Sequence, residues 1–130
     1  MRFVDIKNIG PLEEKVLNIL WNKKTATARD IWRELKKERE YAYSTIRTIL
    51  TRLVEKKIIS QKMDKNKRMY IYTPILTKNE LERKIVKTAI NSLLERFEKS
   101  TISYLVENLS ESDEDVEKIK RKLEEMRKNE

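Results

Sequence analysis

The sequence contains neither cysteine nor histidine among its 130 residues. These absences exclude disulfides, thiolate and imidazole metal sites, cysteine nucleophiles and every acid–base mechanism that uses histidine. Glycine occurs once, at Gly10, so the chain has no glycine-rich loop to bind phosphate groups. The acidic residues are scattered along helical patterns and do not form the loop of oxygen ligands that a hard metal ion needs. The composition therefore argues against an enzyme, a metal site and a bound cofactor.

Long apolar segments are also missing, and so is a basic stretch followed by an apolar signal segment. We therefore expect a cytoplasmic protein that is not a membrane protein. The chain has a high charge instead, since 40% of its residues are charged and the net charge is +8. Residues 1–80 hold 19 basic and 10 acidic side chains, whereas residues 81–130 hold 11 and 12. This uneven distribution favours a polyanionic partner for the N-terminal part over a merely well-solvated surface.

Residues 43–56 have the pattern of an amphipathic helix. Ile46, Ile49, Leu50 and Leu53 recur at the spacing of one buried helical face. The opposite face is polar and cationic, and its short side chains would let the helix enter the major groove of DNA. No acidic residue lies within four positions of Arg47, which weakens the alternative that Arg47 is a surface arginine in a local ion pair.

A short basic hairpin is predicted after this helix, with strands near Ile58–Met63 and Arg68–Thr73 and a polar turn between them. A helix followed by a basic hairpin is typical of the winged helix-turn-helix fold, in which the hairpin is called the wing. One alternative is that the lysines only keep an edge strand soluble, and another is that Ser44 or Thr45 only caps the helix. The candidate DNA-binding residues are Arg29, Tyr43, Ser44, Thr45, Arg47, Thr48, Thr51, Arg52, Lys62, Lys65, Lys67 and Arg68.

The remaining helices are marked by their start signals. Pro11 suits the first position of a helix, and Thr27 and Thr77 each precede an acidic residue by three positions, as in a capping box. No glycine follows the helix over 43–56, so Lys57 is expected in a mildly strained left-handed conformation. The C-terminal part predicts three helices, the first from residue 78, the second over Thr101–Asn108 and the third from Ser112. The predicted fold class is mostly α (α+β), with a winged-helix DNA-binding domain in residues 1–76 and a helical dimerisation domain in residues 77–130.

The C-terminal helices carry continuous apolar stripes that must be buried. Three short helices make a marginal core by themselves, so the stripes pack either on the first domain or on a second chain. We favour the second chain, because two-fold dimers of helix-turn-helix proteins match palindromic operators. The residues predicted to form this homodimer interface are Ile85, Ile90, Leu93, Phe97, Leu105, Leu109, Ile119 and Leu123.

Three segments together resemble the penicillinase-repressor (BlaI/MecI-type) family: 12–21, 27–31 and 42–53. The resemblance extends over about residues 10–126 and implies a winged-helix repressor that dimerises through its C-terminal helices and binds operators with TACA/TGTA half-sites. Copper-sensing members have a cysteine-rich tail, which this chain lacks. Members that respond to β-lactams are inactivated by cleavage of an Asn-Phe bond, and the similar segment here is Asn108-Leu109. This difference leaves open whether a sensor protease is a partner.

The leading hypothesis is a dimeric, sequence-specific transcriptional repressor that binds palindromic operators in double-stranded DNA. The helix over 43–56 would read the major groove, and the wing over 62–68 would contact the backbone. One alternative is a nonspecific architectural DNA-binding protein. Another is a winged-helix protein–protein adaptor, against which the lysine-rich hairpin argues, because protein interfaces are depleted in lysine.

Overall fold

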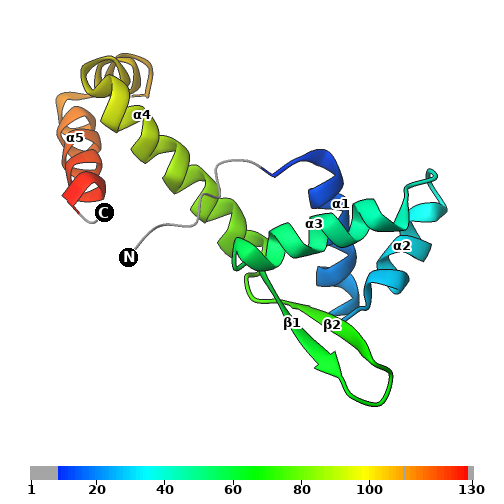
Figure 1. Ribbon diagram of the computed structural model, residues 1–130. Helices are drawn as coiled ribbons and strands as arrows, with labels where there is room; N and C mark the ends of the chain where they lie inside the picture. Colours follow the sequence, from blue (N-terminus) through cyan, green and yellow to red (C-terminus); the bar gives the residue numbers. More distant parts are fainter. Residues whose placement is uncertain (1–8, 110, 129–130) are drawn as a thin grey trace. The chain divides into compact units, whose positions relative to one another are not determined.

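The computed structural model describes residues 9–109 and 111–128, and in this part of the chain it has five helices and one antiparallel hairpin (Figure 1). The chain is mostly helical, as predicted, and the two strands follow the third helix. In order, the elements are α1 (Pro11–Lys23), α2 (Ala28–Lys36), α3 (Tyr43–Glu55), β1 (Ile59–Asp64), β2 (Met69–Pro74), α4 (Lys78–Leu109) and α5 (Asp113–Lys128).

Helix starts follow the local chemistry of the sequence. Pro11 occupies the first turn of α1. At α2 the Thr27 hydroxyl accepts a hydrogen bond from the Asp30 N–H, and the Asp30 carboxylate accepts one from the Thr27 N–H, each at 3.1 Å. Thr77 and Glu80 make the same reciprocal pair at the start of α4, again at 3.1 Å. These capping boxes satisfy backbone donors that the helix leaves unpaired, and both predicted starts are confirmed.

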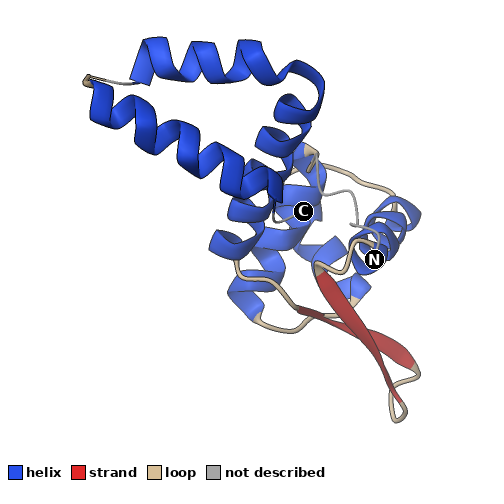
Figure 2. Cartoon of the chain, turned by 90° about the vertical axis from the view of Figure 1, so that its left-hand side faces the viewer, coloured by secondary structure: helices blue, strands red, loops and turns tan. Residues whose placement is uncertain are grey.

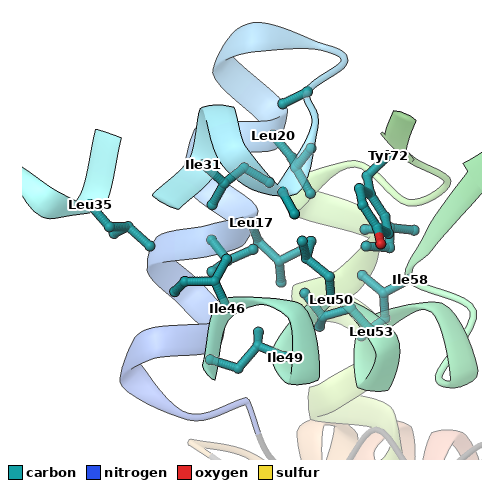
Figure 3. Close-up of a cluster of buried hydrophobic side chains, with 14 of the residues drawn as sticks. Leu17, Leu20, Ile31, Leu35, Ile46, Ile49, Leu50, Leu53, Ile58 and Tyr72 are labelled. Atoms are coloured by element: carbon teal, nitrogen blue, oxygen red, sulfur yellow. The ribbon is translucent and has the colours of Figure 1, made fainter. Parts of the chain in front are cut away.

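The hydrophobic core lies where α1, α2 and α3 meet (Figure 3). Its fully buried side chains include Leu17 and Leu20 from α1, Ile31 from α2, and Ile46 and Leu50 from α3. Each such side chain contributes about 1.5–3 kcal/mol by leaving water, so this packing fixes how the three helices cross.

The two tryptophans are partly buried and pack against this core. The Trp21 indole N–H donates to the Leu76 carbonyl at 2.9 Å, and the Trp32 indole N–H donates to the Tyr41 carbonyl at 2.8 Å. Each ring therefore joins a helix to a connecting segment and also satisfies its own polar atom.

The hairpin is anchored to the helices through Tyr72. Figure 2 shows the two strands as one hairpin. They pair antiparallel in a register in which Met63 faces Tyr70. The Tyr72 N–H and carbonyl both bond to the backbone of Ala26, at 2.8 and 3.1 Å, and the Tyr72 ring is buried. At the tip, the Asp64 carboxylate accepts hydrogen bonds from the N–H groups of Asn66 at 2.9 Å and Lys67 at 3.4 Å. The hairpin is thus held at both its base and its turn.

The chain forms two compact units, Met1–Ile85 and Val86–Glu130, and residues 1–8 of the first unit lie outside the described residues. The division falls within α4, beyond the boundary predicted at 76/77. Leu81 is buried in the core of the first unit and Ile85 packs against that core, so the start of α4 belongs structurally to the winged part. The assignment of the second unit to dimerisation stays a prediction.

The separate helix predicted over Thr101–Asn108 is wrong in its start. The chain is already helical before Thr101, and α4 reaches Leu109 with a single break at Phe97, where φ is −138° and ψ is 53°. Beyond this break the Thr101 hydroxyl donates to the Leu93 carbonyl at 3.3 Å. The predicted left-handed conformation of Lys57 is confirmed, with φ of 61°. No helix among the described residues has the length and apolarity needed to cross a membrane.

Candidate nucleic-acid interface

Helix α3 presents one polar face to solvent. Its apolar face is buried in the core, and on the other face Ser44, Thr45, Arg47, Thr48, Thr51 and Arg52 are all exposed. The Thr48 hydroxyl donates to the Ser44 carbonyl, and the Thr51 hydroxyl donates to the Arg47 carbonyl, both at 3.0 Å. With their protons engaged by the helix, these oxygens face outward as acceptors. None of these six side chains is acidic, and the first acid on this face is Glu55 at the last residue of α3, so the N-terminal part of the face suits approach to base edges.

A groove of about 310 Å³ lies between the start of α2, helix α3 and the hairpin. Three arginines from three different elements line it: Arg29 from α2, Arg47 from α3 and Arg68 from the hairpin. The other lining residues are Thr27, Ala28, Tyr43, Met63, Met69, Tyr70 and Tyr72. The groove is therefore cationic, with aromatic and thioether side chains between the charges.

The three arginines of this groove have no ion-pair partner in the part of the chain that the structure describes. Burial raises the pKa of the Tyr72 phenol, and the charge of nearby Arg47 opposes this rise. Arg47 thus lies close to the hairpin as well as on α3. Guanidinium groups without ion-pair partners have the donors to bind phosphate or guanine edges, and three such arginines line this one groove.

An aromatic pair borders the groove where α2 meets α3. The guanidinium carbon of Arg29 lies 5.7 Å from the centre of the Tyr43 ring. Tyr43 also meets the Trp32 ring edge to face, with centroids 5.7 Å apart and planes at 76°. The sequence did not identify this pair, because it depends on how the two helices cross.

The wing carries the remaining predicted cations. Lys62, Lys65 and Lys67 are exposed on the hairpin, outside the groove lining, and Arg68 enters the groove from a backbone with φ of 51°. Met63, Met69 and Tyr70 were not predicted as site residues, although they line the groove. Alternation along β2 places Tyr70 and Tyr72 on one face of the strand, but it does not account for Met69, which also lines the groove.

Comparison with known proteins decides the family. The sequence profile of the penicillinase repressor family matches residues 9–125. The chain belongs to this family. Penicillinase repressors are transcriptional repressors and not enzymes, and the resemblance read from the sequence is confirmed.

Individual relatives agree with this assignment. The penicillinase repressor of Staphylococcus aureus is 32% identical over 112 residues, which cover 86% of this chain and 87% of that protein. The methicillin resistance regulatory protein MecI of Mammaliicoccus sciuri is 30% identical over 112 residues, covering 86% and 89%. The solution structure of the DNA binding domain of the repressor BlaI superposes with a TM-score of 0.52 at 25% identity, covering 58% of this chain and 90% of that one. The winged-helix fold is confirmed.

The predicted dimer residues have varied surroundings in the structure. Leu93, Phe97 and Leu109 are exposed, at 48%, 52% and 66%. Ile90, Leu105 and Ile119 are half-buried, whereas Leu123 is buried and Ile85 packs on the winged core. Exposed apolar side chains are therefore present on α4. Asn108 and Leu109 form the segment that is similar to the Asn-Phe cleavage site of the β-lactam-responsive members. Asn108 is exposed as well, and its amide donates to the Tyr104 carbonyl at 2.8 Å.

Proposed function

We propose that this protein is a dimeric transcriptional repressor that binds palindromic operators in double-stranded DNA in the cytoplasm. The observation that carries the proposal is the groove beside the polar face of α3 in which Arg29, Arg47 and Arg68 converge, none of them ion-paired within residues 9–109 and 111–128. Membership of a family of transcriptional repressors supports the same conclusion.

In the proposed complex, α3 lies in the major groove with its N-terminal half toward the bases. Arg47 offers two parallel N–H donors to the O6 and N7 atoms of guanine, a pairing that discriminates by about 1–3 kcal/mol. Ser44, Thr45 and Thr48 are short enough to let the helix approach the base edges. Arg52 lies one turn further along the helix, where it suits a phosphate.

In the same complex, the wing and the start of α2 contact the sugar-phosphate backbone. Lys62, Lys65 and Lys67 are exposed there, and Arg68 and Arg29 reach the groove from its two sides. Each phosphate neutralised releases counterions, so these contacts raise the affinity for any sequence and make binding depend on salt. Sequence preference comes from α3, and overall affinity comes largely from the wing.

Dimerisation is assigned to the second unit. The exposed apolar side chains Leu93, Phe97 and Leu109 are covered when two copies meet across a two-fold axis. The same symmetry would present two α3 helices to the two halves of a palindrome. Repression then follows from occupancy of the operator.

Selection of bound duplexes from random DNA by the full chain tests this function. We expect enrichment of one palindromic sequence, which then competes at least about a thousandfold better than bulk DNA in a graded competition. An architectural DNA-binding protein would bind without enriching any sequence. A protein–protein adaptor would retain no duplex even at low salt. Either result would refute the proposal.

A further inference from the structure

Arg29 differs from the other groove cations in how it is held. Its guanidinium group lies over the face of the Tyr43 ring, at 5.7 Å from the centroid, and among the described residues no carboxylate pairs with it. A ring face attracts a cation without occupying its N–H groups or cancelling its charge. The five N–H donors of Arg29 therefore remain free for a ligand in the groove.

The Tyr43 ring is itself in contact with Trp32. The two rings meet edge to face with centroids 5.7 Å apart, and both side chains pack against the hydrophobic core. The Trp32 indole N–H bonds to the Tyr41 carbonyl at 2.8 Å, and the Lys36 ammonium lies 4.2 Å from the centre of the Trp32 ring. Trp32 and Tyr43 thus form a supported surface, here called the aromatic platform, which joins α2 to the first residue of α3.

We propose that the aromatic platform positions Arg29 for a DNA phosphodiester, so that Trp32 and Tyr43 strengthen DNA binding through Arg29 and not through contacts of their own. A free arginine side chain loses rotamer freedom when it binds a phosphate, which weakens binding. The platform restricts Arg29 before DNA arrives and therefore lowers that loss. The proposal rests on the DNA-binding function proposed above and adds positioning residues to it.

A double-mutant cycle on the full chain tests the platform, with Arg29→Ala, Tyr43→Leu and the double variant titrated against one selected operator over a range of salt. Arg29→Ala should lower the slope of log affinity against log salt by about 0.9, the loss of one phosphate contact. Tyr43→Leu should weaken binding about two- to fivefold when Arg29 is present, as expected for an exposed cation–ring contact. In the Arg29→Ala background the same change should have no further effect. An equal loss in both backgrounds would overturn the proposal, because a general structural role acts without Arg29.

Two further variants make the result specific. Arg39→Ala removes a guanidinium that also lies over a tyrosine ring, Tyr41, at 5.8 Å, but outside the groove lining. Arg39→Ala should leave the salt dependence of DNA affinity unchanged. If its slope falls as much as that of Arg29→Ala, the loss of any one positive charge explains both results, and the proposal is overturned. Tyr43→Phe keeps the ring and should recover the coupling to Arg29. A Tyr43→Phe variant that behaves like Tyr43→Leu would instead place the hydroxyl on DNA.

The cycle also separates this inference from the proposed function. If the parent protein binds no duplex DNA in a salt-dependent manner, the DNA-binding function itself fails. If the parent binds its operator and the cycle is additive, only the aromatic platform is refuted. Trp32→Leu extends the test, since it removes the ring that packs against Tyr43 and should reproduce the Tyr43→Leu result, including its dependence on Arg29. Trp32→Leu with an undiminished operator affinity would also overturn the platform.

Discussion

At the scale of the residue, Arg47 and Ile49 lie two positions apart on α3 in opposite surroundings. Arg47 is exposed and lines the groove, whereas Ile49 is 7% exposed and packs in the core. We predict that Arg47→Ala weakens operator binding by about 1–3 kcal/mol and changes the free energy of unfolding by no more than about 0.5 kcal/mol. Ile49→Ala should instead lower the free energy of unfolding by about 2–5 kcal/mol. Operator titration and urea unfolding check both, and an Arg47→Ala protein with parental affinity would show that α3 does not read the bases.

Arg68 has an unfavourable backbone conformation and a side chain that lines the groove. Its φ of 51° is a left-handed conformation that strains residues with a Cβ atom, yet its guanidinium lines the groove. Relief of this strain in Arg68→Gly is offset by the greater freedom of glycine in the unfolded chain. We predict a free energy of unfolding within about 1 kcal/mol of the parent. Affinity should fall for all DNA sequences, with a salt slope lower by about 0.9.

Lys57→Gly is the matched control for Arg68→Gly. Lys57 has a similar φ of 61° but does not line the groove. Its replacement should have the same small effect on unfolding and leave the salt dependence of DNA binding unchanged. If both variants lose the same affinity, hairpin or loop geometry and not the Arg68 charge is responsible.

The surroundings of a residue could be predicted from the sequence where they depend on a single helix or strand. The exposure of Arg47, Thr48 and Thr51 follows from helical periodicity, because the buried face of α3 fixes the other face. The contact between Arg29 and Tyr43 was not predictable, since it depends on the crossing of α2 and α3. No spacing in the sequence encodes that distance, although each residue was separately expected to lie near DNA.

At the scale of the element, helix starts were predictable, and the interruption in α4 was predicted only approximately, since a new helix was expected from Thr101 and the break lies at Phe97. Pro11, Thr27 and Thr77 act through bonds within four residues, so their chemistry is visible in the sequence. Phe97 has no glycine, proline or capping residue beside it that marks a break. The surface against which the first two turns of α4 pack could not be predicted either. Leu81 and Ile85 have the spacing of a buried face, and that spacing does not say which surface buries it.

The capping box of α2 makes a prediction about pH. The backbone N–H of Thr27 lowers the pKa of the Asp30 carboxyl below its ordinary value of 3.8, so the carboxylate stabilises the folded state above that pH. This contribution disappears as pH falls from 3.8 through the lower pKa of the folded protein. Asp30→Ala should therefore lower the free energy of unfolding at pH 7 by about 0.3–1 kcal/mol, a size typical of an exposed acid at a helix start. Urea unfolding of both proteins should show this difference shrinking below pH 3.8, and a difference independent of pH would contradict the assignment.

At the scale of the whole molecule, charge is distributed unevenly along the chain. The excess of basic residues lies in residues 1–80, and residues 81–130 are close to neutral, with 11 basic and 12 acidic side chains. A nearly neutral segment can meet a copy of itself without strong repulsion, whereas two strongly cationic segments would repel each other. The distribution therefore favours self-association through the second unit and leaves the cationic groove of the first unit to DNA.

Sedimentation of the full chain tests this division, and we predict a stable dimer. Leu93→Glu places a charge on an apolar side chain that is 48% exposed, so it should shift the chain to monomer without unfolding it. Ile75→Glu is the matched control, because Ile75 is 54% exposed but belongs to the first unit, and this variant should stay dimeric. The Leu93→Glu protein should keep its affinity for a single half-site and lose its preference for the palindrome, since the second half-site is no longer linked to the first.

A truncated chain gives an independent test of the same interface. The fragment should end after Val86 and not at Leu76, because Leu81 and Ile85 complete the core of the first unit. Removal of the second unit should leave a folded monomer that binds a half-site as the full chain does and binds the palindrome much more weakly. Burial of apolar area at about 25 cal/mol per Å² is the driving force that the fragment lacks. A fragment that still dimerises, or a full-length chain that sediments as a monomer, would show that α4 and α5 do not form a dimer interface.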